Sequence, residues 1–102
     1  MELNQLRVFY HVAKFGSFSL AADALFVTRP AVSIKIKQLE EFYAVRLFER
    51  SGKKIELTNA GEILFAYAEK VFDLVKEAEN RLHTAKAIMA LTMADGEIEY
   101  ER

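Results

Sequence analysis

Apolar residues recur along the chain at spacings that predict helices and one short hairpin. The clearest segment is 28–43, where the apolar positions step by four, three and four: Val32, Ile36, Leu39 and Tyr43. Pro30, the only proline, follows the candidate N-cap Thr28 in the first turn, where a helix tolerates a missing N–H. The other side of this helix carries a short, cationic, hydrogen-bonding set: Arg29, Ser33, Lys35 and Lys37. Such a helix suits a DNA major groove.

Two shorter helices are expected before it, over 4–15 and 20–26. Their candidate end residues are Asn4 and Ser19 as N-caps and Gly16 as a C-terminal stop. The connection between the second helix and the third is too short for anything but a tight corner, which predicts a helix–turn–helix. A generic helical hairpin is the alternative.

A short hairpin is expected after the third helix. The runs 47–50 and 54–57 can alternate, and Gly52 between them supplies the positive φ of a turn. Basic residues cluster at or beside the tip: Arg50, Lys53 and Lys54. A basic hairpin in this position is typical of a wing that touches a sugar–phosphate backbone, and a solvated basic turn is the alternative.

The longest predicted helix begins after Thr58 or Asn59, either of which can cap it. Its apolar positions alternate steps of four and three over four heptads: Leu64, Ala68, Val71, Val75, Ala78, Leu82, Ala85 and Met89. A helix of about 30 residues is about 45 Å long at 1.5 Å per residue, which is more than a small winged domain covers. The apolar side chains in the far half of this heptad seam therefore need a partner outside the domain, and the simplest partner is a second copy of the chain. Packing on its own domain would explain the seam only as far as about Val75.

Together these elements predict a mainly α fold in one domain's length of chain. A winged helix–turn–helix of three helices and a β-hairpin spans 1–58, and a long dimerisation linker helix spans 59–92. The acidic segment 93–102 is either a frayed tail or the start of a hinge to a further domain.

Charge divides along the same line. Residues 1–58 hold nine Lys/Arg against six Asp/Glu, a net +3, and 59–102 hold five against nine, a net −4. The asymmetry favours a functional site in the basic half, residues 1–58, although chance would also explain so small a net charge.

No chemistry of catalysis is visible in the sequence. The two histidines, His11 and His83, lie far apart, there is no cysteine, and no glycine-rich phosphate loop occurs. We therefore expect no metal site, no cofactor and no enzyme. The start of the chain is not a signal peptide and no apolar run is long enough to span a membrane, so a cytoplasmic protein without a membrane partner is expected.

The pattern from about residue 3 to 62 resembles the DNA-binding domain of LysR-type transcriptional regulators. The matching positions, in register, are Leu6-x-x-Phe9-x-x-Val12, Gly16-Ser17-Phe18, Ala21-Ala22, Leu25, Val27, Pro30-Ala31-Val32-Ser33, Ile36, Leu39-Glu40, Leu47-Phe48-x-Arg50 and Leu57-Thr58-x-Ala60-Gly61. The long helix that follows is similar to the family's linker helix.

The resemblance implies a winged helix–turn–helix whose linker helices pair two chains, usually antiparallel, on inverted-repeat operator DNA. Helix 28–43 would lie in the major groove, with Arg29, Pro30, Ser33 and Lys37 as base-reading residues. The implied phosphate-binding residues are Ser17, Ser19, Thr28, Lys35, Arg50, Lys53 and Lys54.

Three positions depart from the family pattern. Arg29 stands where the family usually has glutamine, which would move the preferred base from adenine towards guanine. Ile34 replaces a commonly polar or basic residue and would either touch a thymine methyl or face solvent. Ala44 stands where glycine is frequent, which puts the turn before the wing in question.

Family members usually continue into a two-lobed ligand-binding domain that senses a small molecule and builds tetramers. The chain is therefore expected to be a DNA-binding fragment or a short stand-alone protein. The segment 95–98, which loosely resembles the family's hinge, favours the fragment. A competing hypothesis is a dimerisation module that pairs with a full-length relative and modulates it.

Overall fold

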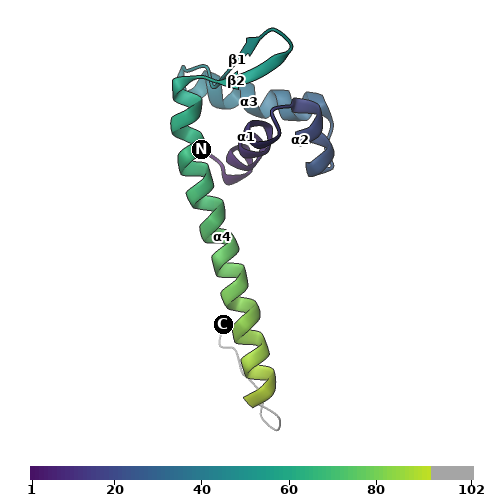
Figure 1. Ribbon diagram of the computed structural model, residues 1–102, viewed down its shortest axis with the longest axis vertical. Coiled ribbons are helices and arrows are strands. Elements are labelled where there is room, and N and C mark those ends of the chain that lie inside the picture. The colour runs from purple at the N-terminus through teal and green to yellow at the C-terminus, as the bar shows by residue number, and fades with distance from the viewer. Residues whose placement is uncertain (93–102) are drawn as a thin grey trace. The chain divides into compact units, whose positions relative to one another are not determined.

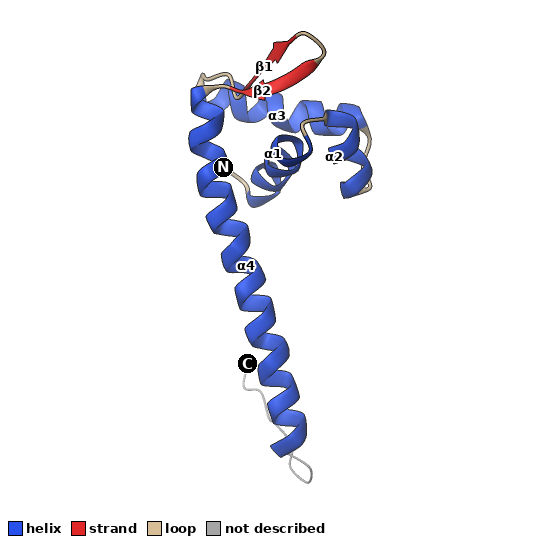
Figure 2. Ribbon diagram, in the orientation of Figure 1, coloured by secondary structure: helices blue, strands red, loops and turns tan. Residues whose placement is uncertain are grey.

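The computed structural model describes residues 1–92 (Figure 1). Its elements in chain order are α1 (Leu3–Phe15), α2 (Phe18–Leu25), α3 (Arg29–Tyr43), β1 (Phe48–Ser51), β2 (Lys54–Leu57) and α4 (Asn59–Thr92). This order confirms the expected mainly helical fold with one hairpin and a long final helix (Figure 2). Met1–Lys70 form one compact unit, and a second unit begins at Val71. The expected tail or hinge, 93–102, lies outside the described residues.

The three short helices of the first unit contact one another pairwise around one apolar core. The side chains without exposed surface are Phe9, Val12, Ala21, Val32 and Ala68. α3 contributes Val32, Ile36 and Leu39, which confirms three of the four positions of its predicted stripe. Tyr43, the fourth, is 44% exposed, because the stripe ends where the helix does. The core therefore fixes which face of α3 remains outside.

The hairpin is antiparallel, with Phe48 opposite Leu57 and Ser51 opposite Lys54. The first strand begins and ends one residue later than the sequence predicted, so the connection is the two residues Gly52 and Lys53. Gly52 has φ +66°, the left-handed conformation that short hairpin turns require. The wing is anchored at its base, because the Phe48 ring lies 5.3 Å from Phe9 and 5.9 Å from Phe18 between centroids.

Two predicted helix starts are wrong by a residue or two. α1 is capped by Glu2, whose side chain forms a capping box with Gln5, instead of by Asn4. α2 is capped by Ser17, whose Oγ accepts a hydrogen bond from Leu20 N at 3.0 Å, so Ser19 lies inside the helix. At α1 the residue that caps is of a less favoured type than Asn4, and at α2 two serines of the same type stand two residues apart.

α2 ends at Leu25, one residue before its predicted end, and three other predicted helix ends are confirmed. Gly16 ends α1 with φ +65°, and Thr28 caps α3 by accepting a hydrogen bond from Ala31 N at 3.3 Å. Of the two candidates at the start of α4, the residue that caps is Thr58, whose Oγ1 accepts from Gly61 N at 3.0 Å.

Both helices of the helix–turn–helix end in a left-handed residue that is not glycine. Phe26 has φ +58° and Ala44 has φ +55°. A carbonyl group in the last turn of each helix is satisfied by the residue after the left-handed one. Val27 N donates to Ala22 O, and Val45 N donates to Glu40 O, both at 3.0 Å. The turn before the wing therefore keeps the geometry that glycine would favour, with alanine in its place.

Gly61, in the first turn of α4, permits a close approach of its backbone to the backbone of Leu47. A Cβ at this position would overlap the carbonyl oxygen of Leu47 and lie 2.9 Å from Leu57 Cδ2. Leu47 O also accepts a hydrogen bond from Thr58 N at 3.0 Å, so the start of α4 is held directly against the segment that enters the wing.

Within residues 1–92, no helix is long and apolar enough to cross a membrane.

Candidate nucleic-acid interface

The residues predicted to read bases lie in the first turn of α3 and along one flank of this helix. Arg29, Pro30 and Lys37 are exposed, and Ser33 is half-buried. Ser33 and Lys37 line an open groove on the surface together with Phe18, Glu40 and Arg46. The structure therefore places Ser33 and Lys37 side by side on one flank of α3, one turn apart, as the helical spacing requires.

Arg29 is positioned by an aromatic ring from the neighbouring helix. Its guanidinium carbon lies 5.8 Å from the ring centroid of Phe18, the first residue of α2, within cation–π range. Phe18 in turn contacts Phe48 at the base of the wing. In the sequence, Phe18 stands out only as a residue of the family pattern, because nothing local to it indicates which side chain it will contact.

Two of the predicted phosphate-binding residues, Ser17 and Thr28, cap helices with their hydroxyl oxygens, which leaves each hydroxyl hydrogen available for donation. Ser17 Oγ and Thr28 Oγ1 each accept a backbone N–H, at the N-termini of α2 and α3. A hydroxyl that accepts one hydrogen bond still has its O–H to donate. The positive end of a helix dipole also favours an anion at these two places. Ser19, the second residue of α2, is exposed.

The basic residues of the wing are all exposed, but they do not share one face. Arg50 pairs with Ile55 and lies on the same hairpin face as Phe48, since side chains two residues apart along a strand point the same way. Lys54, opposite Ser51, lies on the other face, and Lys53 belongs to the two-residue connection. Arg50 therefore lies on the core side of the hairpin, where it lines a pocket with Phe18 and Ile36.

Lys35 lies on the opposite flank of α3 from Ser33. It is half-buried and lines a surface groove with residues of the chain start and the end of α3, among them Met1, Gln5 and Tyr43. Of the predicted contact residues on α3, it is the only one the structure places on this side.

Glu40 was not predicted as a site residue, yet it connects α3 to the wing. Its Oε2 accepts a hydrogen bond from Leu47 N at 2.8 Å and lies 3.9 Å from Arg46 Nε. The carboxylate spans the turn at Ala44 and fixes where the chain leaves α3 for the hairpin. The residue is part of the family pattern, but a contact across a turn gives no periodic signal in the sequence.

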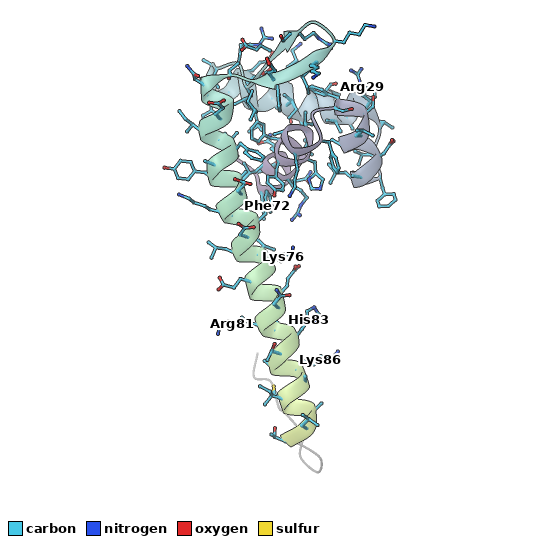
Figure 3. The ribbon with its side chains drawn as sticks, in the orientation of Figure 1. Arg29, Phe72, Lys76, Arg81, His83 and Lys86 are labelled. Atoms are coloured by element: carbon cyan, nitrogen blue, oxygen red, sulfur yellow. The ribbon has the colours of Figure 1, made fainter. Side chains whose placement is uncertain are left out.

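The exposure of the seam residues differs along α4. Ala68 is completely buried within its own chain and has no surface to give to a partner, whereas Leu82 is 70% exposed. Other large apolar residues of α4 are also exposed: Ile63, Tyr67, Leu74, Ile88, Met89 and Leu91. Charged side chains, including Lys76, Arg81 and Lys86, project from the second unit's part of the helix (Figure 3).

No group of three or more His, Asp or Glu side chains in the described part of the chain could hold a metal ion. The ring of His11 is engaged with its own helix, since Nδ1 lies 2.9 Å from Arg7 O.

The tight corner between α2 and α3, the exposed polar face of α3 and the basic hairpin define a winged helix–turn–helix protein of the DNA-binding class. Residues 3–62 match the family model described as "Bacterial regulatory helix-turn-helix protein, lysR family". The chain belongs to this family of transcriptional regulators.

Curated relatives agree with this assignment. A probable RuBisCO transcriptional regulator of Synechocystis sp. is 39% identical over 94 residues, covering 92% of this chain and 27% of the relative. The glycine cleavage system transcriptional activator of Escherichia coli is 41% identical over 92 residues, covering 90% of this chain and 30% of the relative. The chain thus spans about a third or less of the length of these relatives, which are regulators of transcription and not enzymes.

Solved structures match the fold as well. The BenM DBD/catB site 1 DNA complex has a TM-score of 0.72 at 32% identity, covering 96% of this chain and 100% of that one. Full-length CbnR complexed with its target DNA has a TM-score of 0.69 at 35% identity, covering 83% of this chain and 30% of that one. The chain is therefore similar in fold to LysR-family DNA-binding domains solved on DNA.

Proposed function

We propose that the chain binds double-stranded operator DNA sequence-specifically as a homodimer in the cytoplasm, with α3 in the major groove and the wing on the adjacent backbone. In this proposal Arg29, Pro30, Ser33 and Lys37 face base edges. The backbone contacts come from Ser17, Ser19, Thr28, Lys35, Arg50, Lys53 and Lys54. The observation that carries the proposal is the arginine at the start of α3, exposed and yet held over the Phe18 ring. The similarity in fold to BenM and CbnR DNA-binding domains solved on DNA supports it.

The roles divide by chemistry. An arginine that meets guanine O6 and N7 makes a bidentate contact worth about 1–3 kcal/mol of discrimination, whereas a lysine on a phosphate contributes affinity without sequence preference. Arg29 is thus expected to set which base pair is preferred, and Lys53 and Lys54 are expected to set how steeply affinity falls with salt.

The test is selection of binding sites from random double-stranded DNA, followed by titration of the selected inverted repeat at several salt concentrations. Arg29→Ala should weaken binding about tenfold or more to the preferred site and relax the preference at one base pair of each half-site. Arg29→Gln should move that preference from guanine towards adenine. Lys86→Ala removes the same charge from α4 outside the proposed contact face and should leave the selected motif unchanged.

If the wild-type protein selects no motif and binds no DNA even at low salt, the proposal is wrong. If Arg29→Gln leaves the motif unchanged, DNA binding stands but Arg29 does not read a base.

The homodimer is proposed to form through the seam of α4 from Val71 to Met89, including Val75, Ala78, Leu82 and Ala85. Leu64 and the exposed Ile63 and Tyr67 extend it at the near end, without Ala68. Leu82, at 70% exposure, is a large apolar side chain of the seam that an isolated helix leaves in water, and Met89 is also exposed. Val75→Glu combined with Leu82→Glu should yield monomers in analytical ultracentrifugation. Thr84→Glu, which adds the same carboxylate away from the stripe, should leave the dimer intact.

The same exposed stripe favours a second candidate, a dimerisation module that pairs with a full-length relative. Such a module has no need of a base-reading face on α3. It would form the same dimer in ultracentrifugation but show no sequence preference in the selection experiment, and Arg29→Ala would change nothing.

A further inference from the structure

Ile34 is an apolar residue in the middle of the exposed face of α3. Its side chain is 56% exposed and lies across the helix from the buried Val32, Ile36 and Leu39. One turn before it stands Pro30, and one turn after it Lys37 and Gln38, all of them exposed. The Gln38 amide is engaged with α1, because its Oε1 accepts a hydrogen bond from Gln5 Nε2 at 3.4 Å. Ile34 therefore occupies the centre of the face that the proposed function turns towards DNA.

The chemistry of the major groove restricts what such a side chain can meet favourably. The edges of the base pairs there are hydrogen-bond donors and acceptors, and the one apolar group among the four standard bases is the C5-methyl of thymine. An isoleucine placed against a polar edge removes water from that edge and offers no hydrogen bond in return. Placed against a methyl group, it removes apolar surface from water on both sides.

We propose that Ile34 selects thymine, through its C5-methyl group, at one base pair in each half-site. This inference rests on the proposed function, since it needs α3 to lie in the major groove. It assigns a preference that hydrogen bonding from Arg29 or Lys37 does not provide, because neither can recognise a methyl group. It also implies that 5-methylcytosine, which carries the same methyl at the same ring position, is tolerated at that base pair better than cytosine.

The experiment uses the inverted repeat selected by the wild-type protein and replaces its thymines with deoxyuridine, one symmetric pair of positions at a time. Uracil keeps the hydrogen-bonding edge and lacks only the methyl group. At one position the wild type should lose about fourfold in affinity per half-site, the equivalent of roughly 0.8 kcal/mol for one buried methyl-sized group. Ile34→Ala should bind the thymine and uracil sites equally at that position. Replacing the thymine–adenine pair with 5-methylcytosine–guanine should bind the wild type more tightly than unmethylated cytosine–guanine does.

Two variants control the comparison. Ile34→Val keeps a branched apolar side chain and should retain most of the sensitivity to the methyl group. Arg29→Ala should weaken binding to every site while preserving the ratio between thymine and uracil. Because Ile34 is largely exposed and alanine favours a helix, Ile34→Ala should fold, which thermal unfolding followed by circular dichroism checks.

The results separate the two proposals. Equal losses on uracil substitution for the wild type and Ile34→Ala, or no loss at any thymine, would overturn the role of Ile34 while leaving operator binding in place. Failure of the wild type to bind any DNA would overturn both.

Discussion

Gly61 offers the sharpest test of the packing, because two physical effects of one substitution have opposite signs. Replacing a helical glycine with alanine stabilises a helix by about 1 kcal/mol when the site is open. At Gly61 the added methyl group would overlap Leu47 O, lie 3.1 Å from Leu47 C, and lie 2.9 Å from Leu57 Cδ2. The first two of these atoms belong to the backbone and cannot rotate out of the way.

The expected change in the free energy of unfolding depends on how Leu47 must move to make room for the added methyl group. Leu47 is held on both sides, by the hydrogen bond from its N–H to Glu40 and by the one that its carbonyl accepts from Thr58. Overpacking costs about 1–3 kcal/mol, and a broken hydrogen bond adds about 0.5–1.5 kcal/mol. After the gain in helix propensity, Gly61→Ala should lower the free energy of unfolding by about 1–3 kcal/mol.

The assay is urea unfolding followed by circular dichroism at one fixed protein concentration, so that any dimerisation contributes equally to each variant. Gly16→Ala is the matched control, because a Cβ there meets nothing within 4 Å and the only cost is the left-handed φ of +65°. It should lose about 1–2 kcal/mol from backbone strain alone. A Gly61→Ala protein as stable as the wild type, or more stable, would refute the close approach of α4 to Leu47.

Two further predictions concern the turn between α3 and the wing. Ala44→Gly should raise the free energy of unfolding by up to about 1 kcal/mol, measured by the same urea titration, because Ala44 has φ +55° and glycine adopts this conformation without strain; unchanged or reduced stability would argue against a left-handed residue there. Glu40→Ala should lower it by about 1–3 kcal/mol, since Leu47 N loses its acceptor, whereas Glu40→Gln keeps an acceptor oxygen and should cost less. Equal losses for the two Glu40 variants would mean that the hydrogen bond to Leu47 does not matter.

Much of the fold could be predicted because its signals are periodic. The stripe Val32, Ile36 and Leu39 and the glycine in the wing turn each predict an element from residues close in sequence, and both predictions are confirmed. The start of α1 was misplaced because residue type favours Asn4 over Glu2 as an N-cap, and the start of α2 was misplaced because residue type does not distinguish Ser17 from Ser19.

The supporting contacts of the candidate site were harder to predict. The Arg29–Phe18 and Glu40–Leu47 contacts join residues on different elements, so no local spacing encodes them. Resemblance to the LysR family placed Phe18 and Glu40 in a pattern without giving either a physical role. The base-reading and phosphate-binding roles remain predictions, because they concern a partner molecule.

The aromatic contacts from Phe9 through Phe48 and Phe18 to Arg29 have a thermodynamic consequence. A free arginine side chain samples many rotamers, and confining it costs up to about 2 kcal/mol of conformational entropy. Here part of that confinement is completed when the domain folds, since Phe18 is itself held by the first residue of the wing. Under the proposed function, binding at Arg29 therefore starts from a partly confined side chain. A change that loosens the packing of Phe48 against Phe18 is expected to raise the entropic cost of base recognition by Arg29.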